Sequence, residues 1–234
     1  YDIDGNYASV VREGYTTLNP IAKALSDKIL LDRTKLNGSV FADLTILEGL
    51  VWRSELGFDI SGSRAEVFEP TLELGNWRRT INMNAWQRNN SKFWQLKNYL
   101  TYTRNFGSGH AINAMLGQEA WESTYEFMRI SATGLPSNDV QNPRLGEDPQ
   151  INSGFGESAM SSFFGRLMYN YQDRFMGTYT YRRDGSSNFG PENRWASFHS
   201  FATSWRFSNE AFFEPLKSVV SDGKIRVGWG QTGN

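Results

Sequence analysis

Residues 161–184 read SSFFGRLMYNYQDRFMGTYTYRRD, in which apolar and polar side chains alternate on both sides of a short turn signal. Before the turn, the residues that share the apolar parity are Phe163, Leu167, Tyr169 and Tyr171. After it, they are Phe175, Tyr179 and Tyr181. Strict alternation is the pattern of a β-strand with one apolar face, and Gln172-Asp173 suits a tight connection. The stretch therefore predicts an antiparallel hairpin with one apolar and one polar face.

The same alternation recurs along the chain and predicts about eight strands, at residues 36–47, 50–61, 92–104, 110–122, 160–171, 174–184, 194–207 and 224–230. Short connections alternate with long ones, at 62–91 and 123–159. Short periplasmic turns, long extracellular loops and strands of about ten residues or more are typical of an antiparallel transmembrane β-barrel. The segment 208–223 departs from this rule, because it is long and falls on the predicted periplasmic side.

The composition of the chain excludes several classes of partner and of structure. The 234 residues include 24 basic and 25 acidic side chains, so no strong field favours nucleic acid. Cysteine is absent, which excludes disulfides and thiolate metal sites. No apolar run is long enough for a transmembrane helix, and the first residues lack the pattern of a signal peptide. Tryptophans close to predicted strand ends suggest two aromatic girdles at a membrane surface; they are Trp52, Trp94, Trp121, Trp195 and Trp229.

Several motifs invite a catalytic or cofactor interpretation, and none is supported by its context. Gly228, Gly230 and Gly233 spell G-x-G-x-x-G, but within or just after an alternating strand rather than ahead of a helix. His110 and His199 lie on different predicted strands without neighbouring carboxylates. Residues 184–187, Asp-Gly-Ser-Ser, are better explained as a turn than as a nucleophile. We predict no enzyme, no catalytic residue, no metal site and no cofactor.

Two groups of polar residues are candidates for other roles. Glu55 and Asp59 lie on the polar side of a predicted strand, where they are expected to line a wet lumen and pair with basic neighbours. The segment 75–90, GNWRRTINMNAWQRNN, is predicted as an extracellular loop in which rings and guanidinium groups contact a ligand or a partner; the residues concerned are Trp77, Arg78, Arg79, Trp86 and Arg88. The alternative is that these residues start strands or pack against neighbouring loops.

Five stretches in series carry a resemblance to a known family: NPIA at 19–22, SSFFGRLMYNYQDRF at 161–175, RRDGSSNFGPENRW at 182–195, SFATSWRFSNEAFF at 200–213 and KIRVGWGQTGN at 224–234. Together they resemble the SusC/RagA family of TonB-linked outer-membrane transporters of the Bacteroidetes. His199 stands where that family usually has proline, which leaves the start of this strand open.

The resemblance implies a plugged outer-membrane barrel, of which residues 1–234 would form part of the wall without plug, signal peptide or TonB box. Such barrels have about 22 strands. It further implies import of oligosaccharide or peptide, a SusD-like surface lipoprotein as partner, energy from the TonB-ExbB-ExbD complex and contact with outer-membrane lipid. A secreted carbohydrate-binding β-sandwich is the alternative, since it uses similar aromatics and loops.

Overall fold

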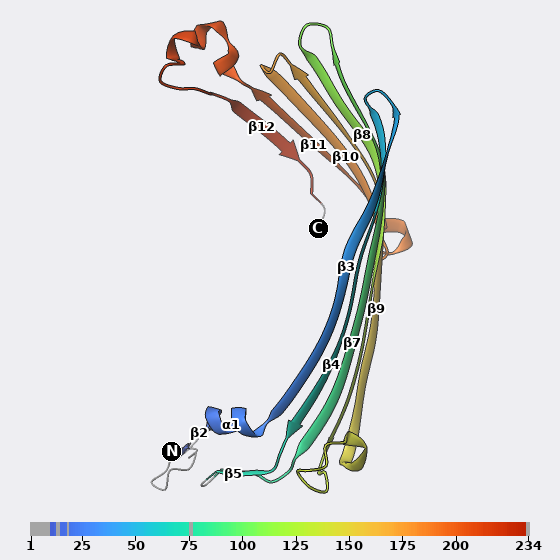
Figure 1. The fold of residues 1–234 in the computed structure, drawn as a ribbon, viewed down its shortest axis with the longest axis vertical. Helices are drawn as coiled ribbons and strands as arrows, with labels where there is room; N and C mark the ends of the chain where they lie inside the picture. The colour runs from blue at the N-terminus through green and yellow to red at the C-terminus, as the bar shows by residue number, and fades with distance from the viewer. Residues whose placement is uncertain (1–9, 13–14, 18, 75–76, 233–234) are drawn as a thin grey trace. The chain divides into compact units, whose positions relative to one another are not determined.

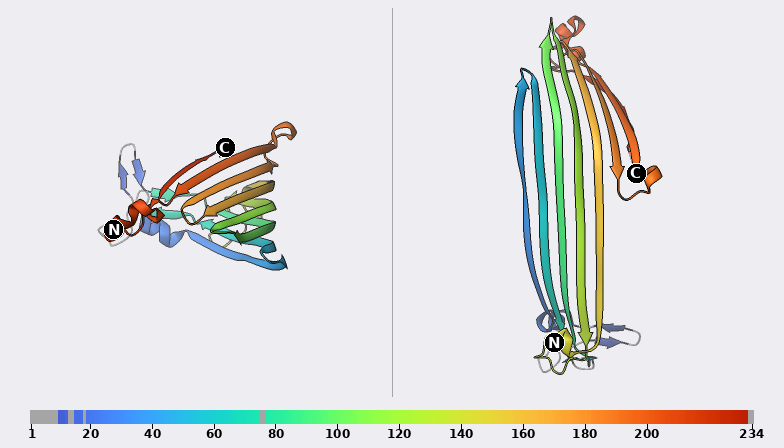
Figure 2. Two further views of the ribbon diagram at one scale, coloured as in Figure 1. Left: turned by 90° about the horizontal axis from the view of Figure 1, so that it is seen from above. Right: turned by 90° about the vertical axis from the view of Figure 1, so that its right-hand side faces the viewer.

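The computed structural model describes residues 10–12, 15–17, 19–74 and 77–232. An eight-stranded sheet dominates them (Figure 1). Its strands are β3 (Lys28–Leu47), β4 (Leu50–Glu69), β7 (Met83–Phe106), β8 (His110–Thr133), β9 (Glu147–Tyr171), β10 (Phe175–Ser186), β11 (Trp195–Trp205) and β12 (Ile225–Gly230). Sheet neighbours follow one another in the chain apart from the short β5 and β6, so the sheet is an antiparallel meander. The long strands run side by side (Figure 2).

Small elements accompany this sheet. β1 (Val10–Arg12) pairs with β2 (Tyr15–Thr17), and β5 (Leu72–Leu74) pairs with β6 (Trp77–Arg79). The helix α1 (Pro20–Ser26) begins after Asn19, whose side chain accepts a hydrogen bond from the backbone N–H of Ile21 at 3.0 Å. The short 3-10 turns are η1 (Pro143–Leu145), η2 (Pro191–Asn193), η3 (Phe207–Asn209) and η4 (Ala211–Leu216). No helix among the described residues is both long and apolar enough to span a bilayer.

The chain forms two compact units. The first takes in the chain up to Leu36, Asp59–Lys92 and Thr124–Gly156. The second takes in Asn37–Phe58, Phe93–Ser123 and the chain from Glu157 onward. The strands β3, β4, β7, β8 and β9 contribute residues to both units, whereas β10, β11 and β12 belong to the second alone. Each unit is described below by itself.

The predicted antiparallel strands are confirmed, with boundaries that match best next to the short connections. The turns after Leu47, Phe106 and Tyr171 fall where the sequence predicts them. The predicted positions of the opposite strand ends were wrong, because most of residues 62–91 and 123–159 belongs to strands rather than loops. Polar residues such as Ser63 and Asn89 occupy these strand extensions, so the sequence there lacks the alternation of apolar and polar residues that predicts a strand. The strands still pair, because the hydrogen bonds between strands are made by the backbone.

Two connections show why particular residues stand at the turns. Gly49 has a φ of +81°, and a side chain there would place its Cβ 2.3 Å from the carbonyl oxygen of Thr103. Gln172 and Asp173 both have positive φ, and the N–H of Arg174 donates to the carbonyl of Tyr171 at 2.9 Å. The turn predicted over residues 184–187 was wrong, because β10 continues to Ser186.

Little of the sheet is covered by other elements. Within the described residues the buried apolar side chains are Ala22, Phe68, Ala85, Ala132, Leu135 and Phe213. In the second unit, by contrast, Phe201 is 52% exposed and Trp229 is 58% exposed. A sandwich would bury such rings between two sheets. The exposed face of β9 to β12 therefore contradicts the sandwich alternative.

Candidate functional site

The register of β9 to β12 aligns apolar side chains into one cross-strand row, Leu167, Tyr179, Phe201 and Trp229. Residues directly opposite each other in an antiparallel pair share a face. The ring centroids of Tyr179 and Phe201 lie 4.7 Å apart, and those of Phe201 and Trp229 lie 6.0 Å apart. The pairing confirms that the apolar parities predicted for these four strands coincide on one surface, called the apolar face below.

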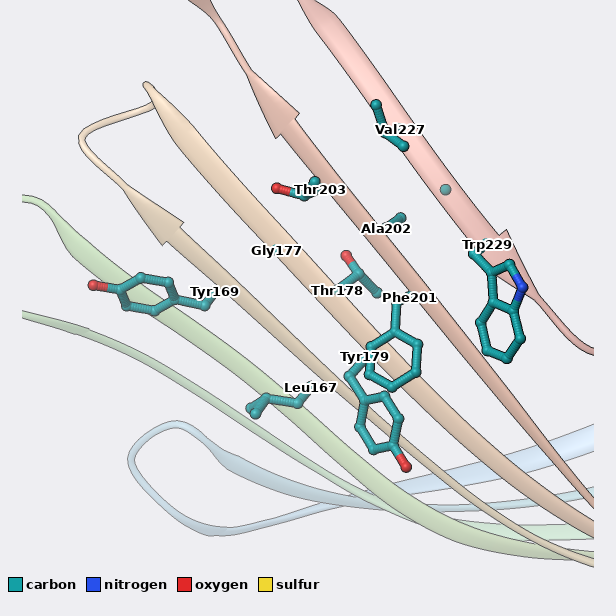
Figure 3. A pocket seen from close by; sticks show the side chains of 11 residues that line it. Leu167, Tyr169, Gly177, Thr178, Tyr179, Phe201, Ala202, Thr203, Val227 and Trp229 are labelled. Carbon is teal, nitrogen blue, oxygen red and sulfur yellow. The ribbon is translucent and has the colours of Figure 1, made fainter.

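A shallow groove of about 420 Å³ lies on this face and is lined by all four residues of the row. Figure 3 shows the side chains that line it. Tyr169, Gly177 and Val227 complete much of its lining, which is almost entirely carbon. A Cβ added at Gly177 would meet no atom within 4 Å, so the glycine leaves open space between the rings. Such a groove offers dispersion contacts to hydrocarbon and few hydrogen-bonding groups to a polar ligand.

Aromatic residues mark both ends of the apolar face. At one end Trp205 stacks on Phe175 with centroids 6.3 Å apart and planes at 3°. At the other end Trp195 lies 6.1 Å from Phe163, and the guanidinium of Arg183 lies 5.3 Å above the Trp195 ring. Amphipathic rings at two levels fit the predicted girdles. 

The girdle prediction was wrong for Trp94 and Trp121, which lie well inside β7 and β8 rather than at strand ends. The ring of Trp121 lies 6.0 Å from that of Phe93. Trp121 is two residues from Glu119, which binds Gln95, so its side chain belongs to the polar side of the sheet.

Both histidines lie among tyrosines. His110, the first residue of β8, has its Nδ1 2.6 Å from the hydroxyl oxygen of Tyr169, and His199 Nδ1 is 2.9 Å from that of Tyr179. These bonds satisfy one ring nitrogen of each residue. In the part of the chain that the structure describes, no cluster of three or more His, Asp or Glu side chains is placed to hold a metal ion. His199 lies inside β11, which starts at Trp195.

The opposite face of the second unit carries a charged network centred on Arg182. Its Nε donates to Asp184 at 2.7 Å, its Nη1 to Glu119 at 3.2 Å and its Nη2 to the hydroxyl of Ser162 at 2.9 Å. Glu119 also accepts a hydrogen bond from Gln95. The network thus links side chains of β7, β8, β9 and β10. Because each group has a charged or polar partner, the face is polar yet electrostatically satisfied.

A hollow of about 890 Å³ lies beside this network, between β10, β11 and the connection that follows Ser186. Strand residues Arg182, Asp184 and Ser200 line one part of it, and Asn188 and Arg194 of the connection line another. Guanidinium, amide and hydroxyl groups next to Phe189 and Phe198 provide both hydrogen-bonding groups and ring surface. Such a lining suits a polar ligand of appreciable size.

The network of Gln95, Glu119, Arg182 and Asp184 was not predicted from the sequence. The available signal was the shared parity of Arg182 and Asp184 on one predicted strand. Pairing across strands could not be read without the register. For Asp59 the predicted pairing with a basic neighbour is confirmed, because its carboxylate lies 2.9 Å from the amino group of Lys35 within the first unit.

The structure brings together three of the five predicted contact residues. Trp77, Arg78 and Arg79 form β6, and the guanidinium of Arg79 lies 5.8 Å from the Trp77 ring centroid. The exposed Arg78 forms a loose ion pair with Glu73 at 3.6 Å. Trp86 and Arg88 lie in strand β7, so their predicted placement in a loop was wrong. The indole N–H of Trp86 is buried and has no hydrogen-bond partner.

Arg79 is engaged in the structure itself. Its Nη1 lies 2.7 Å from Asp27, and the two side chains are only 13% and 7% exposed. Lys23 approaches the same carboxylate at 2.9 Å. Burial raises the pKa of Asp27, but the hydrogen bonds from Arg79 and Lys23 outweigh burial and hold this pKa below its ordinary value. Arg79 therefore stabilises the junction of α1 and β3 and is not free to bind a ligand.

Comparison with known proteins finds similarity to TonB-dependent receptors. No protein-family model matches the sequence. TonB-dependent receptor P39 of Formosa agariphila is 26% identical over all of this chain, and TonB-dependent receptor P26 of the same organism is 29% identical. TonB-dependent receptor SusC of Bacteroides thetaiotaomicron is 45% identical over 76 residues, which is 32% of this chain. The chain spans 22% of the length of P39, 24% of P26 and 8% of SusC.

Among solved structures, the RagAB peptide importer in its open-open state matches 99% of this chain with a TM-score of 0.84, at 20% sequence identity. The RagAB peptide transporter structure matches 97% of the chain with a TM-score of 0.82. This chain covers 26% of each of those chains. At this identity the likeness establishes the fold, an open stretch of barrel wall.

Proposed function

Because the chain is a segment of a SusC/RagA-type TonB-dependent receptor, we propose that it forms part of the wall of an outer-membrane importer for bulky nutrients such as peptides or oligosaccharides. Its role is passage and binding rather than catalysis. Residues 1–234 are then one part of the barrel domain, completed by strands and a plug from the rest of the receptor.

The division of the sheet into two chemically distinct faces carries this proposal. From the row of Trp195 to the row of Trp205, β11 advances ten residues, roughly 33 Å at the usual rise of a strand. At the tilt of about 45° common in barrels, this corresponds to a height of roughly 23 Å, close to the ~25 Å apolar band of outer-membrane barrels. The aromatic ends of the apolar face thus have the spacing of two membrane surfaces.

The polar face suits the inside of the passage. The Arg182 network keeps its charges paired in a wet lumen, and the adjoining hollow offers amides, hydroxyls and rings to a passing polar chain. In the first unit, taken by itself, the amide of Asn89 donates to the hydroxyl of Ser63 at 3.1 Å. Uncharged donors and acceptors of this kind bind peptide or sugar groups without selecting for charge.

The partners follow from the same assignment. The relatives are named TonB-dependent receptors and the RagAB peptide importer, which supports energy input from TonB-ExbB-ExbD and a SusD-like lipoprotein partner. Among the predicted contact residues, Trp77 and Arg78 are the strongest candidates for ligand or lipoprotein contact, with Trp86 and Arg88 on β7 as further members. Arg79 is a weaker candidate, because its guanidinium group is bonded to Asp27.

Neighbouring charge substitutions in β11 test the proposal in the full-length receptor. Phe201→Arg places a charge on the apolar face, where near the bilayer midplane it costs about 2–4 kcal/mol. Ser200→Arg places the same charge one residue away on the polar face. We expect the first variant to lose most of its folded, membrane-inserted receptor and the second to retain it. Equal yields for the two variants would contradict the assignment of the faces.

A further inference from the structure

The connection from Arg206 to Lys224 is the long segment that breaks the rule of short turns, and it is compactly folded. Phe213 is only 6% exposed and packs edge-on against Phe207 with centroids 5.3 Å apart. A Cβ at Gly223 would come within 2.3 Å of the Phe207 ring. The hydroxyl of Ser208 donates to Asp222 at 2.8 Å, which ties the two ends together. Figure 1 shows the segment as a coil at the ends of β11 and β12.

Glu210 fixes this segment to the strand ends. Its carboxylate accepts hydrogen bonds from Arg174 Nε at 2.8 Å and from the indole Nε1 of Trp205 at 3.0 Å. The bond from Arg174 is the main reason why the pKa of Glu210 lies below its ordinary value. The amide of Asn209 donates to the carbonyl of Asp173 at 3.1 Å. The coil therefore has a defined orientation relative to Trp205.

Outside this framework the segment exposes four large apolar side chains, called the apolar cap below. Phe212 is 63% exposed, Leu216 54%, Val219 85% and Val220 45%. Glu214 and Lys217 lie between them in sequence and form an exposed ion pair. An isolated exposed apolar residue needs no explanation, but four of them within residues 212–220 are a candidate interaction surface.

Phe212 connects the apolar cap to the apolar face of the sheet. The Phe212 ring lies 6.2 Å from that of Trp205, and Trp205 stacks on Phe175. Both Trp205 and Phe175 occupy the parity of Phe201 and Tyr179 on their strands. A partner that covers this end of the apolar face therefore also meets Phe212.

We propose that the apolar cap is a membrane-interface anchor that inserts into the boundary between headgroups and acyl chains, beside the ends of β10 and β11. The inference rests on the proposed function, in which the apolar face contacts lipid. Apolar side chains at this level gain free energy by leaving water, while Lys217 and Glu214 stay among headgroups. The indole of Trp205, with its N–H bonded to Glu210, lies at the same interface.

Spin labels in the full-length receptor, reconstituted in vesicles of phosphatidylethanolamine and phosphatidylglycerol, test this anchor. Single cysteines replace Val219 in the apolar cap, Lys217 as the matched control on the same coil and Leu167 on the apolar face. Collisions with oxygen report lipid, and collisions with a water-soluble nickel chelate report water. We expect Val219 to favour oxygen at a shallower depth than Leu167, and Lys217 to favour nickel.

The outcomes separate the two proposals. If Val219 collides with nickel as readily as Lys217 while Leu167 remains in lipid, the anchor is overturned and the wall assignment stands. If Val219 is shielded from both reagents, a protein partner covers the apolar cap, and the lipid anchor is likewise overturned. If Leu167 itself is aqueous, the proposed function fails.

Discussion

Tyr179 on β10 lies directly opposite Phe201 on β11, with ring centroids 4.7 Å apart. Because side chains alternate along a strand, this one pairing sets the face of every other residue in the two strands. A slip of one residue would carry Arg182 and Asp184 onto the apolar face. The aromatic pair and the charged network thus specify the same register from opposite sides of the sheet.

Gly49 is expected to tolerate no side chain. A Gly49→Ala variant of the full-length receptor must accommodate both a φ of +81° and a Cβ 2.3 Å from the Thr103 carbonyl oxygen. We expect a loss of about 1–3 kcal/mol in the free energy of unfolding, measured by urea titration in vesicles. Gly57→Ala in the adjoining strand β4 is the matched control, since its Cβ would meet nothing within 4 Å. A Gly49→Ala protein as stable as the control would show that the turn relaxes freely.

Removing the centre of the charged network should cost more than removing a neighbouring charge. Arg182→Gln deprives Glu119 and Asp184 of their shared partner, and we expect a loss of about 1–3 kcal/mol. Arg183→Gln, on the opposite face over Trp195, should change stability less. Adding Asp184→Asn to Arg182→Gln should restore part of the loss, because one unpaired carboxylate disappears. No recovery in the double variant would mean that the carboxylates do not depend on Arg182.

The junction of α1 and β3 should become less stable at acidic pH. Burial raises the pKa of Asp27 but Arg79 and Lys23 lower it further, so the folded form has a pKa below the ordinary 3.8. The resulting stabilisation is complete above the pKa of the unfolded carboxyl and is lost as pH falls through the lowered value. We expect amide exchange around α1 to accelerate, relative to its intrinsic rate, as the pH falls below about 5 and on through the lowered pKa of Asp27.

Asp27→Asn should abolish this pH dependence, because the titrating group is gone. Glu73→Gln should leave it unchanged, since Glu73 is an exposed partner of Arg78. Persistence of the same acid transition in Asp27→Asn would assign it to another group.

Substitutions of the two adjacent arginines in β6 should distinguish a role in ligand binding from a role in folding. Arg78→Ala, alone or with Trp77→Ala, should reduce capture of peptide or oligosaccharide by the full-length receptor while its folded yield stays unchanged. Arg79→Ala should instead lower the folded yield, because it removes one of the two cations that pair with the buried carboxylate of Asp27 and leaves only Lys23. Capture assays and yields measured on the same preparations distinguish the two effects. Unchanged capture by the variant lacking both Trp77 and Arg78 would remove β6 from the contact site.

The sequence alone predicted the strands of the sheet correctly where one side of a strand is apolar. The parity of Phe163, Leu167 and Tyr179 predicted the strands, and the two-residue connections predicted their pairing. It failed where both sides are polar, as at Ser63 and Asn89, because strands held by backbone hydrogen bonds leave no alternation there. Strand extensions were therefore taken for loops.

The candidate sites show a similar limit. Arg78 and Arg79 are adjacent and look alike in sequence, yet only the structure reveals that Arg79 bonds to Asp27, which lies 52 residues away. The Arg182 network depends on register across four strands, which no single strand encodes. Trp121 lies on the polar side of the sheet, because it is two residues from Glu119 in the same strand and so shares its face.

A scan of lipid contact along β11 tests the central claim most directly. Single spin labels from Ala196 to Ser204 in the full-length, membrane-embedded receptor would be exposed in turn to oxygen and to an aqueous nickel chelate. We predict lipid contact at Ser197, His199, Phe201 and Thr203 and aqueous contact at the residues between them. A profile without this two-residue period, or with the two sets exchanged, would contradict the assignment of an apolar face to lipid and a polar face to the passage.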